Sequence, residues 1–367
     1  MDLGRRAVGG VGAAGVNLAD EGFWRGRRVL VTGHTGFKGA WLSLRLAALG
    51  ARVTGLALDP PSHPSLFDLA EAGGGLDDRR GDIRNNADVA AAIAAAEPEV
   101  VFHLAAQAIV RTGLTEPIAT LDANIMGTAR VLEGLRGGQA KAIVVITSDK
   151  VYLNRDEGRA FREDDPLGGS DPYSGSKSAA EMVTRIYRES FGAPVVSARA
   201  GNVVGGGDFA EGRLLPDAWR AFSAGEALVL RRPQSTRPWS HVLDIVEGYL
   251  LYAEAVFSGA AGLPRALNFG PAPDATPITA LESVELFAAA LGRPLDWRLD
   301  PAPFAEKSQL AIDSSAARKV LGWGERLAGP EAVRAAAAWY AAWAGGADPA
   351  ALSRGMARHQ PSLATAS

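Results

Sequence analysis

A glycine-punctuated turn between a β-rich run and a helical pattern restricts the possible folds of this chain most. Residues 27–32 (RRVLVT) form a short apolar run that predicts a strand, and a helical pattern begins at Ala40. Between them Gly33, Gly36 and Gly39 have the spacing G-x-x-G-x-x-G. Such glycines allow a tight turn, the approach of a pyrophosphate to the backbone, and close packing of helix on strand. The helix N-terminus offers unpaired N–H groups, so the turn is predicted to bind a dinucleotide phosphate.

The cofactor type is indicated by Asp59, which ends a second predicted strand at residues 52–58 and lies 20 residues after Gly39. A carboxylate there can accept hydrogen bonds from a ribose diol and would repel a ribose phosphate, which favours NAD over NADP. Asp82 and Ile83 are expected near the adenine, and small residues after the strand VVFHL near the nicotinamide ribose. The remaining expected cofactor contacts are Thr35, Phe37, Leu104, Ala105, Ala106 and Gln107.

Strands and helices then alternate along the chain, which predicts a parallel sheet covered on both faces. The fold class is therefore α/β, a Rossmann-type doubly wound parallel sheet with a smaller C-terminal substrate-binding lobe. We expect a flexible N-terminal extension, an NAD-binding domain, a substrate lobe that partly returns to that domain, and a flexible tail. The boundaries are 1–22, 23–201, 202–345 and 346–367. The predicted helices are 87–96, 122–136 and 174–191, and the predicted strands are 100–104, 142–147 and 194–199.

Composition excludes several classes of function. The net charge of −3 gives no basic field for nucleic acid or an anionic membrane surface. The chain has no cysteine, and its five histidines lack metal-ligand spacing, so we expect no metal. No apolar run is long enough to span a membrane, which predicts a cytoplasmic protein.

Tyr173 and Lys177 are four residues apart at the start of a predicted helix, so their side chains project from one face. A free tyrosine has a pKa of about 10, and a nearby ammonium together with a cationic nicotinamide would favour its phenolate. Ser148 ends the preceding strand of the predicted sheet. The alternative for Tyr173 and Lys177 is an exposed amphipathic helix face. Their position after the strand that ends at Ser148 favours a catalytic pair and predicts that Tyr173 exchanges a proton with a sugar hydroxyl.

Together with Asn124, these motifs resemble the extended short-chain dehydrogenase/reductase family over about residues 24–345. Longer strings resemble CDP-glucose 4,6-dehydratases of that family: VTGHTGFKGAWLSL, LDPPSHPSLFDLA, TSDKVY, EDDPLGGSDPYSGSK, GNVVGGGDFA and TRPWSHVLD. The resemblance implies a lyase that uses bound NAD to convert CDP-glucose into CDP-4-keto-6-deoxyglucose, a step of deoxysugar and lipopolysaccharide O-antigen biosynthesis.

The resemblance also implies roles for the catalytic residues. Tyr173 takes the proton of the 4-hydroxyl while hydride passes to NAD, Lys150 removes the C5 proton, and Asp149 protonates the departing 6-hydroxyl. Related dTDP-glucose dehydratases have Asp-Glu at the pair Asp149-Lys150, and epimerases usually have small uncharged residues there. This sequence therefore has Lys150 where the dTDP-glucose enzymes have a glutamate base, and a surface ion pair is the alternative for Asp149 and Lys150.

In the second lobe, Asn202, Arg213 and Arg237 lie in strings that resemble nucleotide-sugar-binding segments. A guanidinium matches phosphate oxygens in a bidentate way, so Arg237 is expected at the diphosphate. The resemblance implies a homodimer or higher homo-oligomer. His34 and His103 are expected to be structural, whereas Trp239 and His241 could either stack on a base or close the lobe. The alternative functions are another nucleotide-sugar 4,6-dehydratase, a 4-epimerase, and a non-enzymatic NAD-sensing protein.

Overall fold

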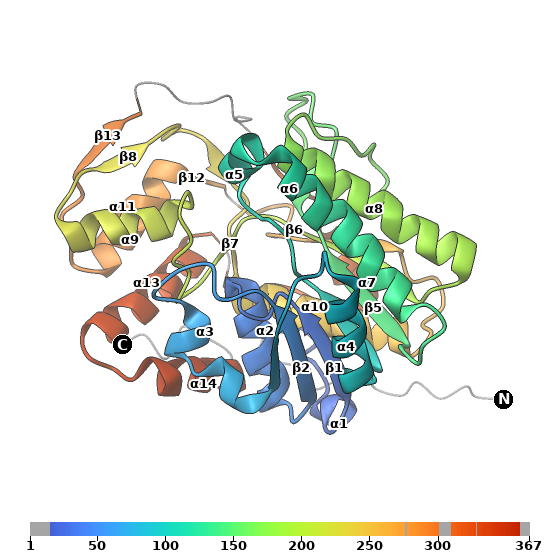
Figure 1. Cartoon of the computed structure of the whole chain (residues 1–367). Coiled ribbons are helices and arrows are strands. Elements are labelled where there is room, and N and C mark those ends of the chain that lie inside the picture. Colours follow the sequence, from blue (N-terminus) through green and yellow to red (C-terminus); the bar gives the residue numbers. More distant parts are fainter. Residues whose placement is uncertain (1–14, 276, 301–309, 328, 360–367) are drawn as a thin grey trace.

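The computed structural model describes residues 15–275, 277–300, 310–327 and 329–359. Its centre is a sheet of seven strands in the order β11-β6-β5-β4-β1-β2-β3, and every neighbouring pair is parallel (Figure 1). The strand order reverses between β1 and β4, and this is the place where doubly wound sheets open a crevice at their carboxyl ends. The predicted fold class is confirmed.

The central unit contains seven strands and the elements that join them. The strands are β1 (Arg28–Thr32), β2 (Arg52–Ala57), β3 (Asp77–Arg80), β4 (Val100–His103), β5 (Ala142–Ile146), β6 (Val195–Ala200) and β11 (Ala266–Phe269). The α-helices are α1 (Glu21–Trp24), α2 (Phe37–Ala48), α3 (Leu66–Leu69), α4 (Asn86–Ala96), α5 (Val110–Thr115), α6 (Pro117–Leu121), α7 (Gly127–Leu135), α8 (Pro172–Phe191) and α10 (Val242–Phe257). The shorter turns are η1 (Ala72–Gly75), the π-helical η2 (Asp122–Met126) and η3 (Asp149–Val151).

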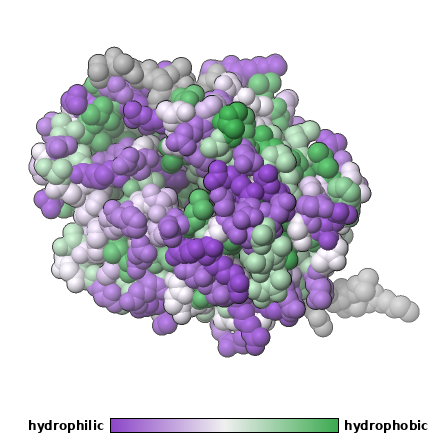
Figure 2. All heavy atoms as spheres, viewed as in Figure 1, coloured by the Kyte–Doolittle hydropathy of each residue, from purple (hydrophilic) through white to green (hydrophobic). Residues whose placement is uncertain are grey.

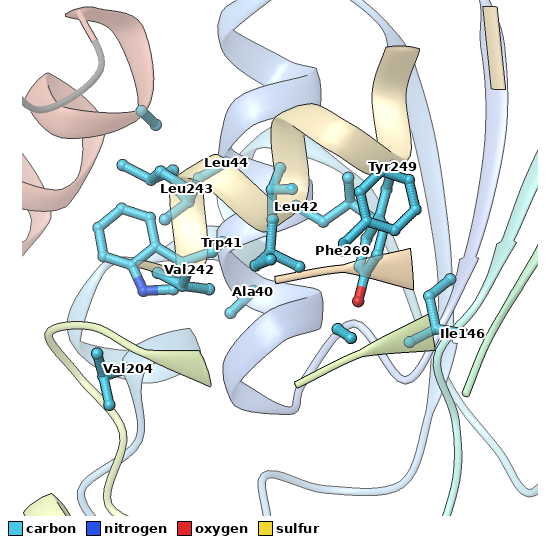
Figure 3. Packing of buried hydrophobic residues seen from close by; sticks show 14 of the residues in the cluster. Ala40, Trp41, Leu42, Leu44, Ile146, Val204, Val242, Leu243, Tyr249 and Phe269 are labelled. Carbon is cyan, nitrogen blue, oxygen red and sulfur yellow. The ribbon is translucent and has the colours of Figure 1, made fainter. Parts of the chain in front are cut away.

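Each face of the sheet packs on its own set of helices. On one face, α2 and α10 pack together and bury the larger apolar cluster, in which Figure 3 shows Trp41 beside Val242 and Leu243. Tyr249 of α10 contacts Phe269 of β11 edge to face, with 5.6 Å between ring centroids. The other face packs on α4, α7 and α8. These two cores fix the strand ends on which the candidate site is built.

The smaller lobe lies beyond the carboxyl edge of the sheet, to the left in Figure 1. On the face in Figure 2, hydrophilic and hydrophobic residues are interspersed over both parts. The elements that follow β6, apart from α10 and β11, are β7 (Val203–Val204), α9 (Leu214–Ala224), β8 (Leu228–Leu230), β9 (Thr236–Arg237), β10 (Ser240–His241), β12 (Ile278–Thr279), α11 (Ala280–Ala290), β13 (Trp297–Leu299), α12 (Ser315–Leu321), α13 (Pro330–Ala344) and α14 (Pro349–His359).

Both ends of the described chain are more ordered than expected. The N-terminal segment docks on α10, because the amides of Ala19 and Asp20 donate to Glu247 and Glu254 at 2.5 and 2.9 Å. The tail expected to be flexible from residue 346 instead forms α14, which packs against α2. Its N-terminus is capped by Asp348, which accepts hydrogen bonds from two backbone amides of α14. Residues 1–14 and 360–367 of the expected extensions lie outside the described residues.

Candidate active site

The glycine turn has the shape that a phosphate-binding turn requires. Gly33 has φ +79°, and a Cβ there would lie 2.6 Å from the amide nitrogen of Ala105. A Cβ on Gly39 would collide with the carbonyl oxygen of Gly33. Gly36 is the N-cap of α2, which begins at Phe37 rather than at the predicted Ala40. The turn therefore needs glycine for steric reasons and leaves the amides of a helix N-terminus open to an anion.

Other predicted cofactor residues gather at the same edge. Thr35 donates from Oγ1 to the carbonyl oxygen of Leu58 at 2.9 Å, which joins the turn to the end of β2. Asp59 follows directly, and its side chain is 88% exposed and free to meet a ribose. Asp82 lies beyond β3, where Arg84 donates to its carboxylate at 2.6 Å. Ile83 is buried in the second apolar cluster, so it contributes packing.

The residues after β4 lie opposite the glycine turn. The amide of Ala105 donates to Oγ1 of Thr32 at 3.3 Å, and Leu104 and Ala106 flank it along the chain. The side chain of Gln107 is used internally, since its Oε1 accepts from Ile109 and its Nε2 donates to Thr120 at 2.9 Å. These contacts hold the side chain of Gln107 against the segments that follow it.

Asn124, one of the residues that carry the family resemblance, holds the loop after β4 in place. Its side chain exchanges two hydrogen bonds with the backbone of Gln107 at 2.8 and 3.0 Å, and it donates to Ser176 of α8 at 2.8 Å. Asn124 lies in the π-helical turn η2, an irregularity that is frequent at functional sites. The π turn thus connects the loop after β4 with α8.

Tyr173 and Lys177 lie in the first turns of α8, and both are buried. Nζ of Lys177 donates to the carbonyl oxygen of Ile146 at 3.1 Å, and burial lowers the pKa of Lys177 to about 8. Burial raises the pKa of Tyr173, whereas a hydrogen bond with Ser148 and the charge of Arg213 act in the opposite direction. The pKa of Tyr173 is thus raised rather than lowered as expected, because desolvation is the largest effect.

Asp149 is buried at the end of β5 beside Ser148, which donates to Oδ1 at 2.8 Å. Its Oδ2 is buried without a hydrogen-bond partner among the described atoms. Burial raises the pKa of Asp149, and the charges of Lys150 and Arg237 partly offset that effect. A buried carboxyl with a raised pKa and one unused oxygen suits a proton donor.

Lys38 is a site residue that sequence analysis missed. It lies in the first turn of α2 and is half-buried. Burial, followed by the charges of Arg213 and Lys177, lowers the pKa of Lys38 to about 7. A cation at a helix N-terminus is unfavourable unless an anion binds there, so Lys38 adds to the evidence for a phosphate site. The sequence signal that could have identified it is its position between Gly36 and Gly39 of the glycine turn.

Two of the predicted substrate residues lie near the cluster of Ser148, Asp149 and Tyr173. Arg213 occupies the N-cap position of α9, and the charge of Asp208, to which its Nη1 donates at 3.1 Å, raises the pKa of Arg213. Arg237 of β9 is near enough for its charge to act on Asp149. The carbonyl of Asn202 accepts from the amide of Ser240, joining the lobe to β10. Two guanidinium groups therefore line the side of the site that faces the second lobe.

The histidines of the site region are buried and structural. His103 bridges Thr32 and Thr128 at 2.7 and 2.9 Å, and burial lowers the pKa of His103 to about 3. His34 is fully buried under the turn, where Nε2 contacts Oδ1 of Asp78 at 2.8 Å. Trp239 and His241 are also buried, which favours a role in closing the lobe.

With this geometry established, comparison with known proteins identifies the family. Residues 29–270 match the NAD dependent epimerase/dehydratase family. The chain belongs to this family. It is 42% identical to the CDP-glucose 4,6-dehydratase of Salmonella typhimurium over 342 residues, covering 90% of this chain and 95% of the relative. The predicted family resemblance is confirmed.

Solved structures of the family have the same fold. The Thermus thermophilus UDP-glucose 4-epimerase in complex with NAD is 25% identical and superposes with a TM-score of 0.74, covering 84% of this chain and 97% of the other. A dTDP-glucose 4,6-dehydratase from Streptomyces venezuelae, also with NAD bound, has a TM-score of 0.75 at 21% identity, covering 88% and 99%. Within the described part of this family member, no helix is both long and apolar enough to cross a membrane.

Proposed function

We propose that this protein is an NAD-dependent CDP-glucose 4,6-dehydratase, a lyase that converts CDP-glucose into CDP-4-keto-6-deoxyglucose. The observation that carries the proposal is the buried carboxyl of Asp149, which has one unpaired oxygen and lies near enough to Tyr173 for its charge to act on the phenol. The sugar and nucleotide are proposed from the relative that is 42% identical over 90% of the chain.

The residues present fit a dinucleotide. A Cβ on Gly33 would collide with the backbone of Ala105 and a Cβ on Gly39 with the carbonyl oxygen of Gly33, so the tight turn at the N-terminus of α2 requires glycine, and Asp59 stands exposed after the next strand. These residues would hold the diphosphate and a ribose, and the loop after β4 would lie against the nicotinamide side. When bound, NAD supplies a hydride acceptor and donor at the sugar, so the overall reaction needs no external oxidant.

Proton transfer at C4 is assigned to Tyr173. The phenolate of Tyr173 accepts the proton of the 4-hydroxyl, and the buried ammonium of Lys177 lies one helical turn away on the same face. Burial raises the pKa of Tyr173 and so favours the neutral phenol over the phenolate. The positive charge of a bound nicotinamide would favour the phenolate, so proton acceptance is coupled to cofactor binding.

Loss of water is assigned to Asp149 and Lys150. A ketone at C4 acidifies the C5 proton, which Lys150 is proposed to accept, and Asp149 is proposed to protonate the leaving 6-hydroxyl. Burial favours the protonated form of Asp149, as a general acid requires. Lys38 is a second amine in the same electrostatic environment, because the charge of Asp149 also acts on it.

A nucleotide-sugar 4-epimerase is the alternative within the family. It would use the same cofactor, tyrosine and lysine, but it has no leaving hydroxyl to protonate. In an epimerase, the buried carboxyl of Asp149 with its unpaired oxygen would lower the stability of the fold without serving the reaction, since buried polar groups normally have hydrogen-bond partners. We therefore favour the dehydratase, with dehydration of another nucleotide-activated hexose as the nearest variant of the proposal.

The test is to incubate the purified protein separately with the CDP, dTDP, UDP and GDP forms of glucose and to follow each product by mass spectrometry. The proposal predicts loss of one water from CDP-glucose and no change in the other three. A product of unchanged mass in which C4 is inverted would identify an epimerase instead. Loss of water from dTDP-glucose alone would support the proposed dehydration but show that the substrate carries dTDP rather than CDP.

The remaining expectations extend this proposal. We propose a homodimer formed through the helices on the α7 and α8 side of the sheet, where Met182 and Ile186 are 49% and 51% exposed. The division of the chain at residue 202, the roles of the individual site residues, the cytoplasmic location and the O-antigen pathway remain predictions.

A further inference from the structure

Asp59, the proposed ribose acceptor, has an arginine beside it. Nη1 of Arg80 donates to Oδ1 of Asp59 at 3.3 Å and to the carbonyl oxygen of Leu58 at 3.4 Å. Arg80 ends β3, and its register partner on β2 is Ala57, two residues before Asp59. The arginine is 36% exposed and the carboxylate 88%, so both groups border the surface on which a ribose would lie.

Arg80 is held in place by contacts that do not involve Asp59. Its Nη2 donates to Oδ2 of Asp78 at 2.9 Å, and its guanidinium lies over the ring of Phe67, 5.0 Å from the centroid. Asp78 is fixed by the buried His34 of the glycine turn, whose ring meets Phe67 edge to face at 5.4 Å. Removal of Asp59 therefore leaves these anchors of Arg80 intact.

The network also depends on the glycine turn itself. A Cβ at Gly55 of β2 would collide with the ring of His34, so the glycine leaves room for the histidine that anchors Asp78. The chain of contacts thus runs from the phosphate-binding turn through His34, Asp78 and Arg80 to Asp59. The parts that would hold the diphosphate and the ribose are connected by hydrogen bonds.

We propose that Arg80 is a specificity-determining residue, and that the Asp59–Arg80 pair, rather than Asp59 alone, sets the choice between NAD and NADP. With Asp59 present, Arg80 orients the exposed carboxylate toward the ribose diol and pairs with both Asp59 and Asp78. Without Asp59, the anchored guanidinium becomes a site for a ribose 2′-phosphate, because arginine matches phosphate oxygens in a bidentate way. This inference rests on the proposed binding of NAD.

The experiment is a fluorescence titration of the full chain, freed of nucleotide, with NADH and NADPH in the absence of sugar nucleotide. Asp59→Ser should weaken NADH binding and strengthen NADPH binding, each by roughly tenfold or more, the effect of one charge-assisted contact. Adding Arg80→Met to Asp59→Ser should remove the gain for NADPH. Arg80→Met alone should weaken the binding of NADH several-fold, because Asp59 would no longer be held toward the ribose.

Arg79→Met is the matched control, since Arg79 precedes Arg80 on β3, pairs with Asp77 at 2.7 Å and points to the other face. It should change neither affinity. If Asp59→Ser fails to gain NADPH affinity, or if the gain survives loss of Arg80, the inference is overturned. Failure of the unmodified protein to bind NADH would overturn the proposed function as well, which separates the two outcomes.

Discussion

At the scale of the single residue, the sequence predicts those site residues whose chemistry follows from local spacing. The glycines of the turn, Asp59 and the pair Tyr173 and Lys177 lie together at one edge of the sheet, as parallel strands require. Lys38 could not be predicted in the same way. Its lowered pKa depends on burial and on Arg213, which comes from the second lobe far along the chain.

The first prediction concerns Tyr173. Tyr173→Phe removes the proton acceptor while keeping the ring that fills the buried site, so dehydration should fall about 10²–10⁴-fold. NAD binding should change little, because the glycine cradle and Asp59 are untouched. Product formation followed by mass spectrometry and NADH titration of the same preparation check both statements. A variant with the unmodified rate would remove Tyr173 from the mechanism.

The second prediction concerns Lys38 and the stability of the ligand-free protein. Burial lowers the pKa of Lys38 from its ordinary value of about 10.4 to about 7 in the folded protein. Between these values the unfolded chain binds more protons, so stability rises with pH, and at pH 6 the buried charge destabilises the fold. Lys38→Met should therefore raise the Tm at pH 6 by roughly 2–4 °C and have a smaller effect at pH 10. Equal or lower Tm at pH 6 would contradict this account.

At the scale of the element, the sequence predicts the strongly patterned strands and helices and misses those that tertiary contacts support. The edge strand β3 reads DDRR, and such charged sequences are typical of edges but give no apolar signal. The composition of residues 346–367 predicts a flexible tail, whereas Pro349–His359 form the helix α14. Asp348 followed by Pro349 was the signal that could have located its start.

The docking of the N-terminal segment on α10 gives the third prediction. Glu254 accepts hydrogen bonds from the amide of Asp20 and from Nε1 of Trp24, at 2.9 and 2.6 Å, and burial raises the pKa of Glu254 to about 7. A carboxyl with a raised folded pKa contributes stability that is full below its unfolded pKa of about 4.3 and is lost as pH rises through 7.

Glu254→Gln keeps an acceptor oxygen without the charge. In the unmodified protein, ionisation of Glu254 should lower the free energy of unfolding by on the order of 3 kcal/mol between pH 4.5 and pH 8. The Glu254→Gln variant should lack this decrease and be more stable than the unmodified protein at pH 8. Urea unfolding at both pH values measures the difference. Glu254→Ala is the control and should be less stable at pH 5, because it leaves the indole N–H of Trp24 buried without a partner. An unchanged pH slope in Glu254→Gln would contradict the assignment.

The helix layer that contains α8 gives the fourth prediction. Ile118 of α6, Met126 of η2 and Ile186 of α8 are 77%, 48% and 51% exposed, and these helices lie side by side in Figure 1. Ile186→Glu places a charge in the proposed dimer interface and should shift the protein to a monomer in light scattering. Leu299→Glu, at a 59% exposed position in the second lobe, is the control and should remain dimeric. A dimeric Ile186→Glu variant would exclude this face.

At the scale of the whole molecule, the sequence predicts the doubly wound sheet and the presence of a second lobe, because strand and helix periods alternate clearly. It does not predict how the lobe meets the sheet. Contacts between distant segments, such as the charge of Arg237 acting on Asp149, appear only in the folded structure. The substrate is accordingly inferred from the family relative and from the assembled site together.

The central claim is that oxidation, loss of water and reduction occur in one site on one sugar. The most direct test uses CDP-glucose with deuterium at C4 and locates the label in the product by NMR. The account predicts a product that has lost one water and carries the deuterium at C6, since hydride removed from C4 is returned within the same site. Deuterium found at C4 of a product of unchanged mass, or lost to the solvent, would contradict it.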